Sequence, residues 1–298
     1  MQNVLLIINP VSGRKTARMK LYEIVDFMSR NDCKTTIFTT SRKGEATEIV
    51  KTHATEYGRI VCCGGDGTLN EVFTGITELG IQIPVGYVPT GTTNDLANAL
   101  GLTSETPKAL NTAIYGEKKS LDIGEFNDTQ FFSYVASFGA FTKASYATPQ
   151  WMKNVMGHTS YLVYGIADLK DIRSHKTKII TDGLEISGEF VFGSVSNSTV
   201  LGGVFKFPEE TIDFSDGKFE VLLVKTPRTP RDMQSILNAI LNQEYNEDTV
   251  LFFKASFLTF TFEESTPWTI DGEFAGTMEK VTIKNLHGRA EVFVDGEV

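Results

Sequence analysis

Hydrophobic positions follow two different periods along about the first 120 residues. Short apolar runs at Val4–Ile8, Arg59–Cys63 and Pro84–Val88 predict buried strands. Thr35–Thr39 is rich in β-branched residues and also predicts a strand. Between these runs, apolar residues recur every three or four positions, which predicts helices over Lys15–Ser29, Glu45–Tyr57, Leu69–Glu78, Asn94–Leu100 and Pro107–Tyr115. Strands that alternate with helices predict an α/β domain with a parallel sheet and helices on both faces.

Beyond Gly124, the pattern changes to alternating and aromatic runs. Asp-Gly dipeptides at Asp182, Asp216 and Asp271 separate or flank these runs, as hairpin turns do. The expected strands are Gln130–Ala136, Thr177–Thr181, Glu189–Val195, Lys218–Val224, Leu251–Phe253, Phe257–Phe262, Val281–Lys284 and Ala290–Val294, with helices near Pro149–Arg173 and Pro230–Asn242. We therefore expect an α/β domain over 1–124 and an antiparallel β-sandwich domain over 125–298, whose last strand could return to the first domain.

Composition is that of a globular chain. Its 298 residues are 41% hydrophobic and 22% charged, and no run of about 18 apolar residues is present. The net charge of −9 argues against nucleic acid as a partner. Three cysteines cannot form a disulfide framework, which favours a reducing compartment, so we expect a cytoplasmic protein. The four histidines are scattered and do not have metal-ligand spacing, so we do not expect a zinc site.

Two glycine-rich turns carry the first chemical signal. Gly64–Glu71 and Pro89–Asp95 each follow an apolar run and lead into a helical pattern. Such turns bind anions because backbone N–H groups converge there and glycine allows a phosphate to approach closely. Two of them, about one strand–helix unit apart, predict a site for a nucleotide polyphosphate.

Asp66 is the unusual member of the first turn. Thr68 and Glu71 have the spacing of a capping box, so helix capping does not require Asp66. A carboxylate beside a phosphate is favourable only where a cation bridges them. Asp66 is therefore interpreted as linked to magnesium, and a purely structural turn aspartate is the alternative.

The common nucleotide motifs are absent: the sequence has no P-loop, no G-x-G-x-x-G turn and no protein-kinase set. Instead, three segments in this order resemble the soluble bacterial diacylglycerol kinase family, which is akin to sphingosine and ceramide kinases. They are Asn9-Pro10-x-Ser12-Gly13, Gly64-Gly65-Asp66-Gly67-Thr68 and Gly91-Thr92-x-Asn94-Asp95. The resemblance covers essentially the whole chain.

The resemblance implies an ATP-dependent lipid kinase whose active site lies in a cleft between a nucleotide domain and a β-rich domain. It implies nucleotide contacts at Asn9, Pro10, Val11, Ser12, Gly13, Thr40, Gly65, Asp66, Gly67, Thr68, Leu69, Asn70, Glu71 and Thr92. Phosphoryl transfer to an alcohol needs phosphate positioning, a divalent cation and a carboxylate near the attacking oxygen, and these parts are available here.

The later Asp-Gly dipeptides gain roles from the same resemblance. In Asp271-Gly272-Glu273, Glu273 would be the general base, with Asp271 as the next candidate. Asp216, with groups at Asp213 and Lys218, would hold a structural Mg²⁺. For both dipeptides an ordinary hairpin turn is the alternative.

Three questions stay open. Related enzymes often carry a basic residue where this chain has Asn98, so another cation, such as Arg14 or Lys15, would have to substitute. The acceptor could be diacylglycerol, a sphingoid or phosphatidylglycerol-like lipid, or a soluble molecule as in NAD kinases. A non-catalytic nucleotide-binding regulator is the alternative from another class.

Membrane contact is expected to be peripheral, and a homodimer is possible. The candidate basic patches are Arg14, Lys15, Arg18 and Lys20, and Lys170, Arg173, Lys176 and Lys178. Either patch could instead be an ordinary solvated face.

Overall fold

The apolar run Val4–Ile8 lies in strand β1 (Gln2–Ile8) of the computed structural model, where all its side chains are buried. β1 pairs in parallel with β2 (Cys33–Thr39) on one side and with β3 (Arg59–Gly64) on the other. β3 pairs in parallel with β4 (Val85–Pro89). Since both faces of these central strands are covered, they are apolar throughout instead of alternating.

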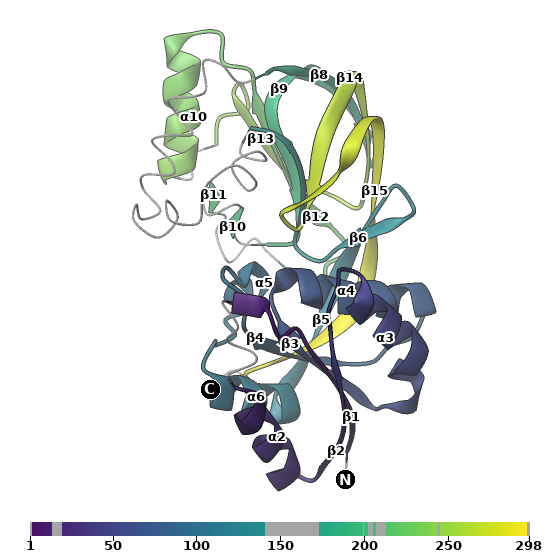
Figure 1. Ribbon diagram of the computed structural model, residues 1–298. Helices are drawn as coiled ribbons and strands as arrows, with labels where there is room; N and C mark the ends of the chain where they lie inside the picture. The colour runs from purple at the N-terminus through teal and green to yellow at the C-terminus, as the bar shows by residue number, and fades with distance from the viewer. Residues whose placement is uncertain are drawn as a thin grey trace. The chain divides into compact units, whose positions relative to one another are not determined.

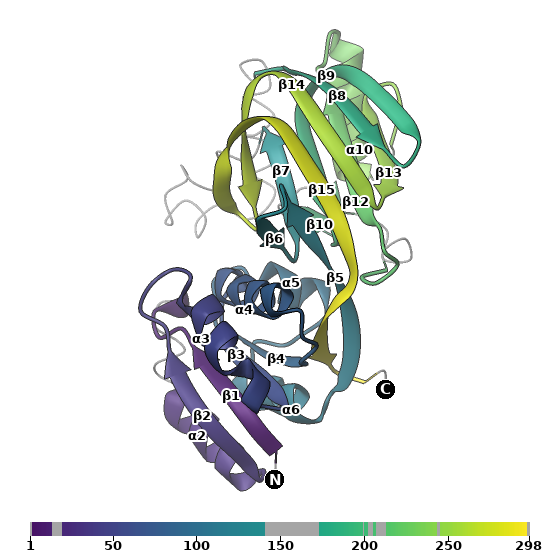
Figure 2. The ribbon, with the colours of Figure 1, turned by 90° about the vertical axis from the view of Figure 1, so that its right-hand side faces the viewer.

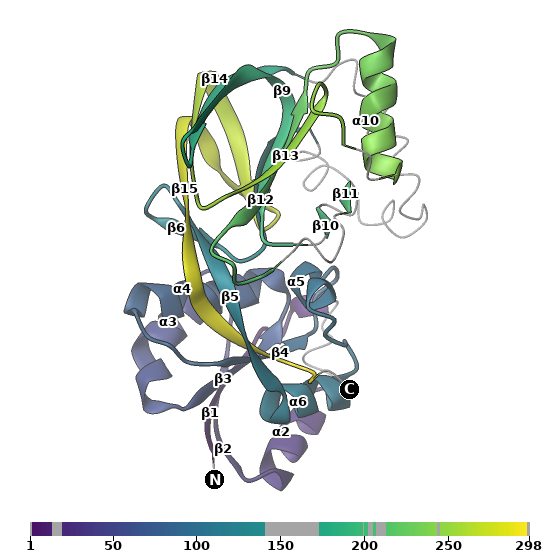
Figure 3. The ribbon, with the colours of Figure 1, turned by 180° about the vertical axis from the view of Figure 1, so that it is seen from behind.

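Helices lie on both faces of this sheet (Figure 1 and, from behind, Figure 3). One face carries α2 (Leu21–Arg30) and α6 (Thr106–Tyr115), whose apolar side chains share a core with those of β1 and β3. The other carries α3 (Glu45–His53) and α4 (Asp66–Leu79). Two short elements complete the set, a 3-10 turn at Ala54–Glu56 and α5 (Asp95–Ala99).

The chain divides into two compact units, Met1–Ile123 with Leu286–Val298, and Gly124–Asn285. The structure describes residues 2–13, 20–140, 173–198, 200–201, 205–206, 213–242 and 245–296. The chain passes between the units within β5 (Glu117–Phe126) and within β15 (Glu273–Val294). Val292 of β15 pairs in parallel with Val85, so the end of the last strand extends the sheet of the first unit.

The second unit is built on antiparallel strands. They are β6 (Gln130–Phe132), β7 (Val135–Gly139), β8 (His175–Thr181), β9 (Leu184–Ser196), β10 (Val200–Leu201), β11 (Phe205–Lys206), β12 (Phe219–Lys225), β13 (Val250–Ala255) and β14 (Phe257–Ile270), with helix α10 (Pro230–Asn242). β14 and β15 form the long hairpin that is visible in Figure 2.

The antiparallel pairing is as predicted, but the main strands are joined in one sheet instead of the two sheets of a sandwich. Their order is β13-β12-β9-β7-β14-β15, and β8 pairs with both β9 and β14. The physical reason is the length of β9 and β14. Each is long enough to pair with β8 and β7 in succession along one edge, which keeps all of these strands in one hydrogen-bonded ladder.

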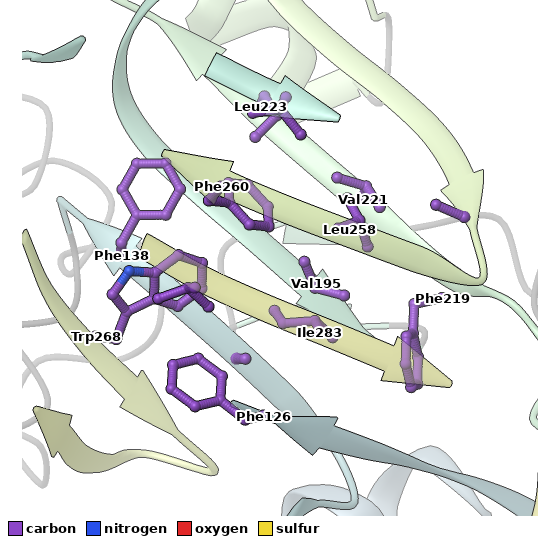
Figure 4. Close-up of a cluster of buried hydrophobic side chains, with 14 of the residues drawn as sticks. Phe126, Phe138, Val195, Phe219, Val221, Leu223, Leu258, Phe260, Trp268 and Ile283 are labelled. Atoms are coloured by element: carbon purple, nitrogen blue, oxygen red, sulfur yellow. The ribbon is translucent and has the colours of Figure 1, made fainter. Parts of the chain in front are cut away.

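An aromatic core fills this unit (Figure 4). The ring centroid of Trp268 lies 5.0 Å from that of Phe138 and 5.2 Å from that of Phe260, and all three side chains are fully buried. Edge-on and tilted ring pairs of this kind add to the stabilisation from burial. The core thus holds β14 in place up to Ile270, the residue before the Asp271-Gly272 turn.

Three expectations about elements change. The predicted strands Val281–Lys284 and Ala290–Val294 are parts of the single strand β15. Strand β5 has no strong signal because its first four residues are exposed and polar. The helix expected over Pro149–Arg173 lies outside the described residues, apart from Arg173, which precedes β8.

Candidate functional site

Three loops of the first unit meet where β1, β3 and β4 end. Asn9 Nδ2 donates to Thr68 Oγ1 at 3.0 Å, which joins the first loop to the second. Thr90 Oγ1 donates to Ser12 Oγ at 3.1 Å, which joins the third loop to the first. The sequence places these loops at the carboxyl ends of parallel strands, where open α/β sheets bind their ligands.

Glycine is required at the closest approach of the loops. A Cβ added to Gly91 would lie 2.7 Å from the Gly65 Cα, closer than a carbon atom can come. A Cβ added to Gly13, whose φ is +51°, would lie 1.8 Å from the Thr90 carbonyl oxygen. The glycines therefore allow the backbones of the three loops to approach one another closely.

A cavity of about 600 Å³ opens beside the third loop. Its lining residues are Lys20, Pro89, Thr90, Gly91, Thr92, Thr93, Asn94, Ala97, Asn98, Leu102, Thr103 and Ser104. Asn94 fixes the loop, since its Oδ1 accepts from the Gly91 N–H at 2.9 Å and its Nδ2 donates to the Gly91 carbonyl at 3.1 Å. Among the predicted nucleotide contacts, Thr92 thus faces this cavity.

Asp66 joins the second loop to the third. It is the first residue of α4, and its Oδ1 accepts from the Leu96 N–H at 3.2 Å. Thr93 Oγ1 donates to Asp66 Oδ2 at 3.4 Å. The carboxylate therefore orients the third loop, a role that is compatible with a cation nearby but does not depend on one.

The predicted capping box is wrong. Helix α4 begins at Asp66, so Thr68 is the third helical residue, and its hydroxyl accepts from Asn9. Glu71 instead caps helix α3, where its two oxygens accept from the Gly44 N–H at 2.7 Å and the Ala46 N–H at 3.1 Å. Glu71 makes this long-range contact instead of a local one because the N-terminus of α3 has no capping side chain of its own.

The other predicted nucleotide contacts differ in exposure. Val11 is 70% exposed, whereas Leu69 is fully buried. Thr40 is buried at the end of β2, where its N–H donates to the Ile8 carbonyl. Pro10 is partly buried between Asn9 and Val11. Thr40 and Ile8 thus lie side by side at the ends of β2 and β1. Leu69, in contrast, is a buried core residue of α4.

Asp271 lies in the tight turn of the β14–β15 hairpin. Its φ is +46° and that of Gly272 is +81°, as a type I′ turn requires. The carboxylate accepts from the N–H groups of Ser133, Tyr134 and Val135 at 2.9–3.0 Å and from Ser133 Oγ at 3.2 Å. Burial raises the pKa of the Asp271 carboxyl to about 6, although these donors oppose the rise. Every hydrogen-bond partner is a donor, which indicates a structural role.

Glu273 has the opposite environment. It is the first residue of β15, pairs with Ile270 and is exposed to solvent. Its side chain faces solvent, while Asp271 beside it holds the turn. Of the two predicted catalytic carboxylates in this turn, Glu273 is the more exposed, and its catalytic role stays a prediction.

The predicted metal residues lie in the segment 213–218, directly before β12. Asp213 Oδ1 accepts from the Ser215 N–H, and Asp216 Oδ1 accepts from the Lys218 N–H at 2.9 Å. Lys254 Nζ lies 2.7 Å from Asp216 Oδ2 and thereby balances its charge. No cluster of three or more His, Cys, Asp or Glu side chains suited to a metal is found in the described part of the chain.

Glu220 is the residue here that the sequence analysis missed. Its side chain is fully buried, Lys254 Nζ lies 3.3 Å from its Oε1, and neither oxygen accepts a hydrogen bond from a described residue. Burial raises the pKa of the Glu220 carboxyl to about 7, against the lowering effect of Lys254. The strand pattern around Glu220 gave no sign of this role because it does not show which residue of a paired strand lies opposite Glu220.

The basic patches are only partly described. Arg14, Lys15, Arg18 and Lys170 lie outside the described residues. Arg173, Lys176 and Lys178 each form an ion pair with a carboxylate, of Glu264, Glu263 and Glu185 respectively. In the three described members of the second patch, each positive charge is thus paired with a carboxylate. Among the described residues, no helix is long and apolar enough to cross a bilayer.

Comparison with known proteins gives a consistent set of relatives. The model of the diacylglycerol kinase catalytic domain matches residues 3–126. A diacylglycerol kinase of Bacillus subtilis (strain 168) is 30% identical over 280 residues, which cover 93% of this chain and 92% of that protein. A diacylglycerol kinase of Staphylococcus carnosus is 28% identical over 98% of this chain and 95% of its own length.

Solved structures agree with the fold. A candidate diacylglycerol kinase from Bacillus anthracis str. Sterne has a TM-score of 0.82 and is 25% identical, with 99% of this chain and 97% of that chain covered. A second solved structure of a diacylglycerol kinase from the same strain has a TM-score of 0.76. The similarity therefore extends over both compact units.

Proposed function

This chain belongs to the diacylglycerol kinase family, and from that premise we propose that it transfers the terminal phosphoryl group of ATP to the free hydroxyl of diacylglycerol. The hydroxyl oxygen forms a bond to phosphorus, the bond from phosphorus to the ADP oxygen breaks, and the hydroxyl proton leaves to a base. The products are phosphatidic acid and ADP.

The observation that carries this proposal is the convergence of the three loops at one edge of the parallel sheet. The Asn9–Thr68 and Thr90–Ser12 hydrogen bonds hold the loops together. Phosphoryl transfer depends mainly on positioning and electrostatic stabilisation, and converging backbone N–H groups supply both for a polyphosphate. Thr40, Gly65 and Thr92 are the further contacts that we assign to ATP.

Glu273 is the base in this proposal. It is exposed to solvent, whereas the carboxylate of the neighbouring Asp271 accepts hydrogen bonds from the backbone N–H groups of Ser133 and Val135. A carboxylate is a sufficient base because phosphoryl transfer through a loose transition state needs only late removal of the hydroxyl proton.

Mg²⁺ fits two places by the chemistry of their donors. Asp66 lies among the phosphate loops, where a cation bound to the phosphates would be within reach of its carboxylate. Asp216 offers a carboxylate, with backbone carbonyls at Asp213 and Lys218, and oxygen ligands are those that Mg²⁺ prefers. Lys254 Nζ already lies 3.3 Å from Glu220 Oε1, so this ammonium group would keep a counter-ion if a cation took its place at Asp216.

The membrane is the source of the acceptor, so we propose peripheral and reversible contact with lipid. Because Arg173, Lys176 and Lys178 are paired, we expect this contact to be weakly sensitive to their removal. A homodimer stays a prediction that sedimentation velocity can test.

The test of function is magnesium-dependent release of ADP from ATP with different acceptors. Mixed micelles of diacylglycerol should stimulate release strongly and yield phosphatidic acid. If phosphoryl transfer to sphingosine, phosphatidylglycerol or NAD is as fast as or faster than transfer to diacylglycerol, diacylglycerol is not the preferred acceptor. Nucleotide binding without transfer to any acceptor would favour a regulator and overturn the proposal.

A further inference from the structure

The cavity beside the third loop contains a single kind of charge. Of the twelve described residues that line it, Lys20 carries the one charged side chain, and five others carry hydroxyl groups. The chain as a whole has a net charge of −9. A polar cavity whose described lining has a cation and no carboxylate is therefore opposite in sign to the average charge of the chain.

Lys20 is available for a ligand. It lies at the N-terminal boundary of α2, where its carbonyl accepts from the Ile24 N–H and its side chain makes no capping hydrogen bond. None of the described carboxylates forms an ion pair with it. The lysine side chain thus has no structural task in the described part of the molecule that would explain its place in the cavity.

The cavity is continuous with the loop to which ATP is assigned. Its lining includes Gly91 and Thr92 of this loop together with Asn98, Thr103 and Ser104. Asn98 Nδ2 is turned toward the loop, where it donates to the Thr93 carbonyl at 2.9 Å. An anion held by the Gly91 loop would therefore lie in the same space as the Lys20 ammonium group.

We propose that this cavity is a phosphate subsite and that Lys20 is its cation, which binds a phosphate of the nucleotide during transfer. This rests on the proposed function. The ammonium group would neutralise charge that the backbone N–H groups of the loop cannot neutralise alone. Lys20 would then determine the preference for a polyphosphate over an uncharged nucleoside.

The experiment compares the affinities of ATP and adenosine for the wild-type chain and Lys20→Met, by calorimetry or by competition. The methionine keeps the length of the side chain but removes its charge. We expect ATP to bind about 10- to 100-fold more weakly, which is the usual effect of losing a hydrogen bond to a charged group. Adenosine should bind equally to both proteins.

Matched variants make the result specific. Lys34→Met removes an exposed lysine from the same unit, on strand β2 outside the cavity, and should leave ATP affinity unchanged. Lys20→Arg keeps the positive charge and should retain most of the affinity for ATP. Asn98→Arg in the Lys20→Met background returns a cation to the same cavity and should restore at least part of the lost affinity.

Two results would overturn the inference while the proposed function stands. One is a Lys20→Met protein that binds ATP within about twofold of wild type. The other is a Lys20→Met protein that loses affinity for phosphatidate vesicles but keeps its affinity for ATP. That result would assign the subsite to a lipid phosphate. A wild-type chain that neither binds ATP nor phosphorylates diacylglycerol would instead refute the proposed function itself.

Discussion

The same dipeptide, Asp-Gly, has opposite roles in the two units. In the first unit, Asp66-Gly67 begins helix α4 after a parallel strand, and the carboxylate reaches the third loop. In the second unit, Asp271-Gly272 forms a type I′ turn between antiparallel strands, and the carboxylate is buried among backbone N–H groups. A parallel strand must be followed by a crossover, whereas an antiparallel strand can return at once.

The two carboxylates therefore have different tasks: that of Asp66 orients a loop at the sheet edge, and that of Asp271 holds a hairpin turn. At the parallel sheet edge, the strand ends are open to ligands, so a carboxylate there lies next to bound groups. At the hairpin, the turn uses its own aspartate for backbone hydrogen bonds and exposes the next carboxylate, that of Glu273. The two carboxylates of this turn therefore differ in exposure: that of Asp271 is held by backbone donors, and that of Glu273 faces solvent.

The largest effect is expected for Glu273→Gln. Glutamine keeps the size of the side chain but cannot accept the proton, and loss of a general base typically lowers the rate by about 10²- to 10⁴-fold. We expect kcat to fall in this range while ATP affinity is unchanged, as steady-state kinetics and nucleotide binding would measure. Normal turnover, or failure through lost ATP binding, would show that Glu273 is not the base.

Asp66→Asn should follow, with a loss of turnover of at least about 100-fold. The amide cannot balance a cation near the phosphates, and its NH₂ group would face one of the two donors that now bind the carboxylate. Thermal melting should show that the fold is kept. A folded variant with near-normal activity would make Asp66 a turn residue and contradict the link to magnesium.

Asp271→Asn should act on stability and not on chemistry. All four hydrogen-bond partners of the carboxylate are donors, so an amide would leave at least one of them unsatisfied in a buried place. We expect a loss of about 2 kcal/mol in the free energy of unfolding, measured by denaturant titration. If the variant is stable but inactive, Asp271 takes part in the reaction and the contrast with Glu273 fails.

Much of the first unit could be predicted because its signals are local. Apolar runs identified the parallel strands, and the glycine turns at their ends identified the loops that meet. The role of Asp271 could not be predicted, because its donors at Ser133–Val135 lie 136–138 positions away in the sequence.

Long-range contacts also explain the errors at particular residues. Glu71 has the spacing of a local cap, but it caps α3 because the packing of α3 against α4 brings the N–H groups of Gly44 and Ala46 within its reach. Glu220 occupies an inward position where the strand pattern expects an apolar residue, and only Lys254 on the paired strand β13 explains it. The residue that lies opposite a given strand position depends on which strands pair and in what register. Sequence periodicity predicts a strand but not the strand with which it pairs.

The smallest effect is expected for the third Asp-Gly dipeptide, at Asp216. Its carboxylate bonds Lys254 and the Lys218 N–H at a partly buried position, so Asp216→Ala should cost about 1 kcal/mol of stability. If a cation binds there, Mg²⁺ should raise the melting temperature of the wild-type protein but not that of the variant. Lys254→Met sharpens the test. Removal of the competing ammonium group should destabilise the protein without Mg²⁺ and enlarge the shift that Mg²⁺ produces. The same Mg²⁺ response in wild type and Asp216→Ala would exclude a metal at this turn and leave Asp216 as the counter-ion of Lys254.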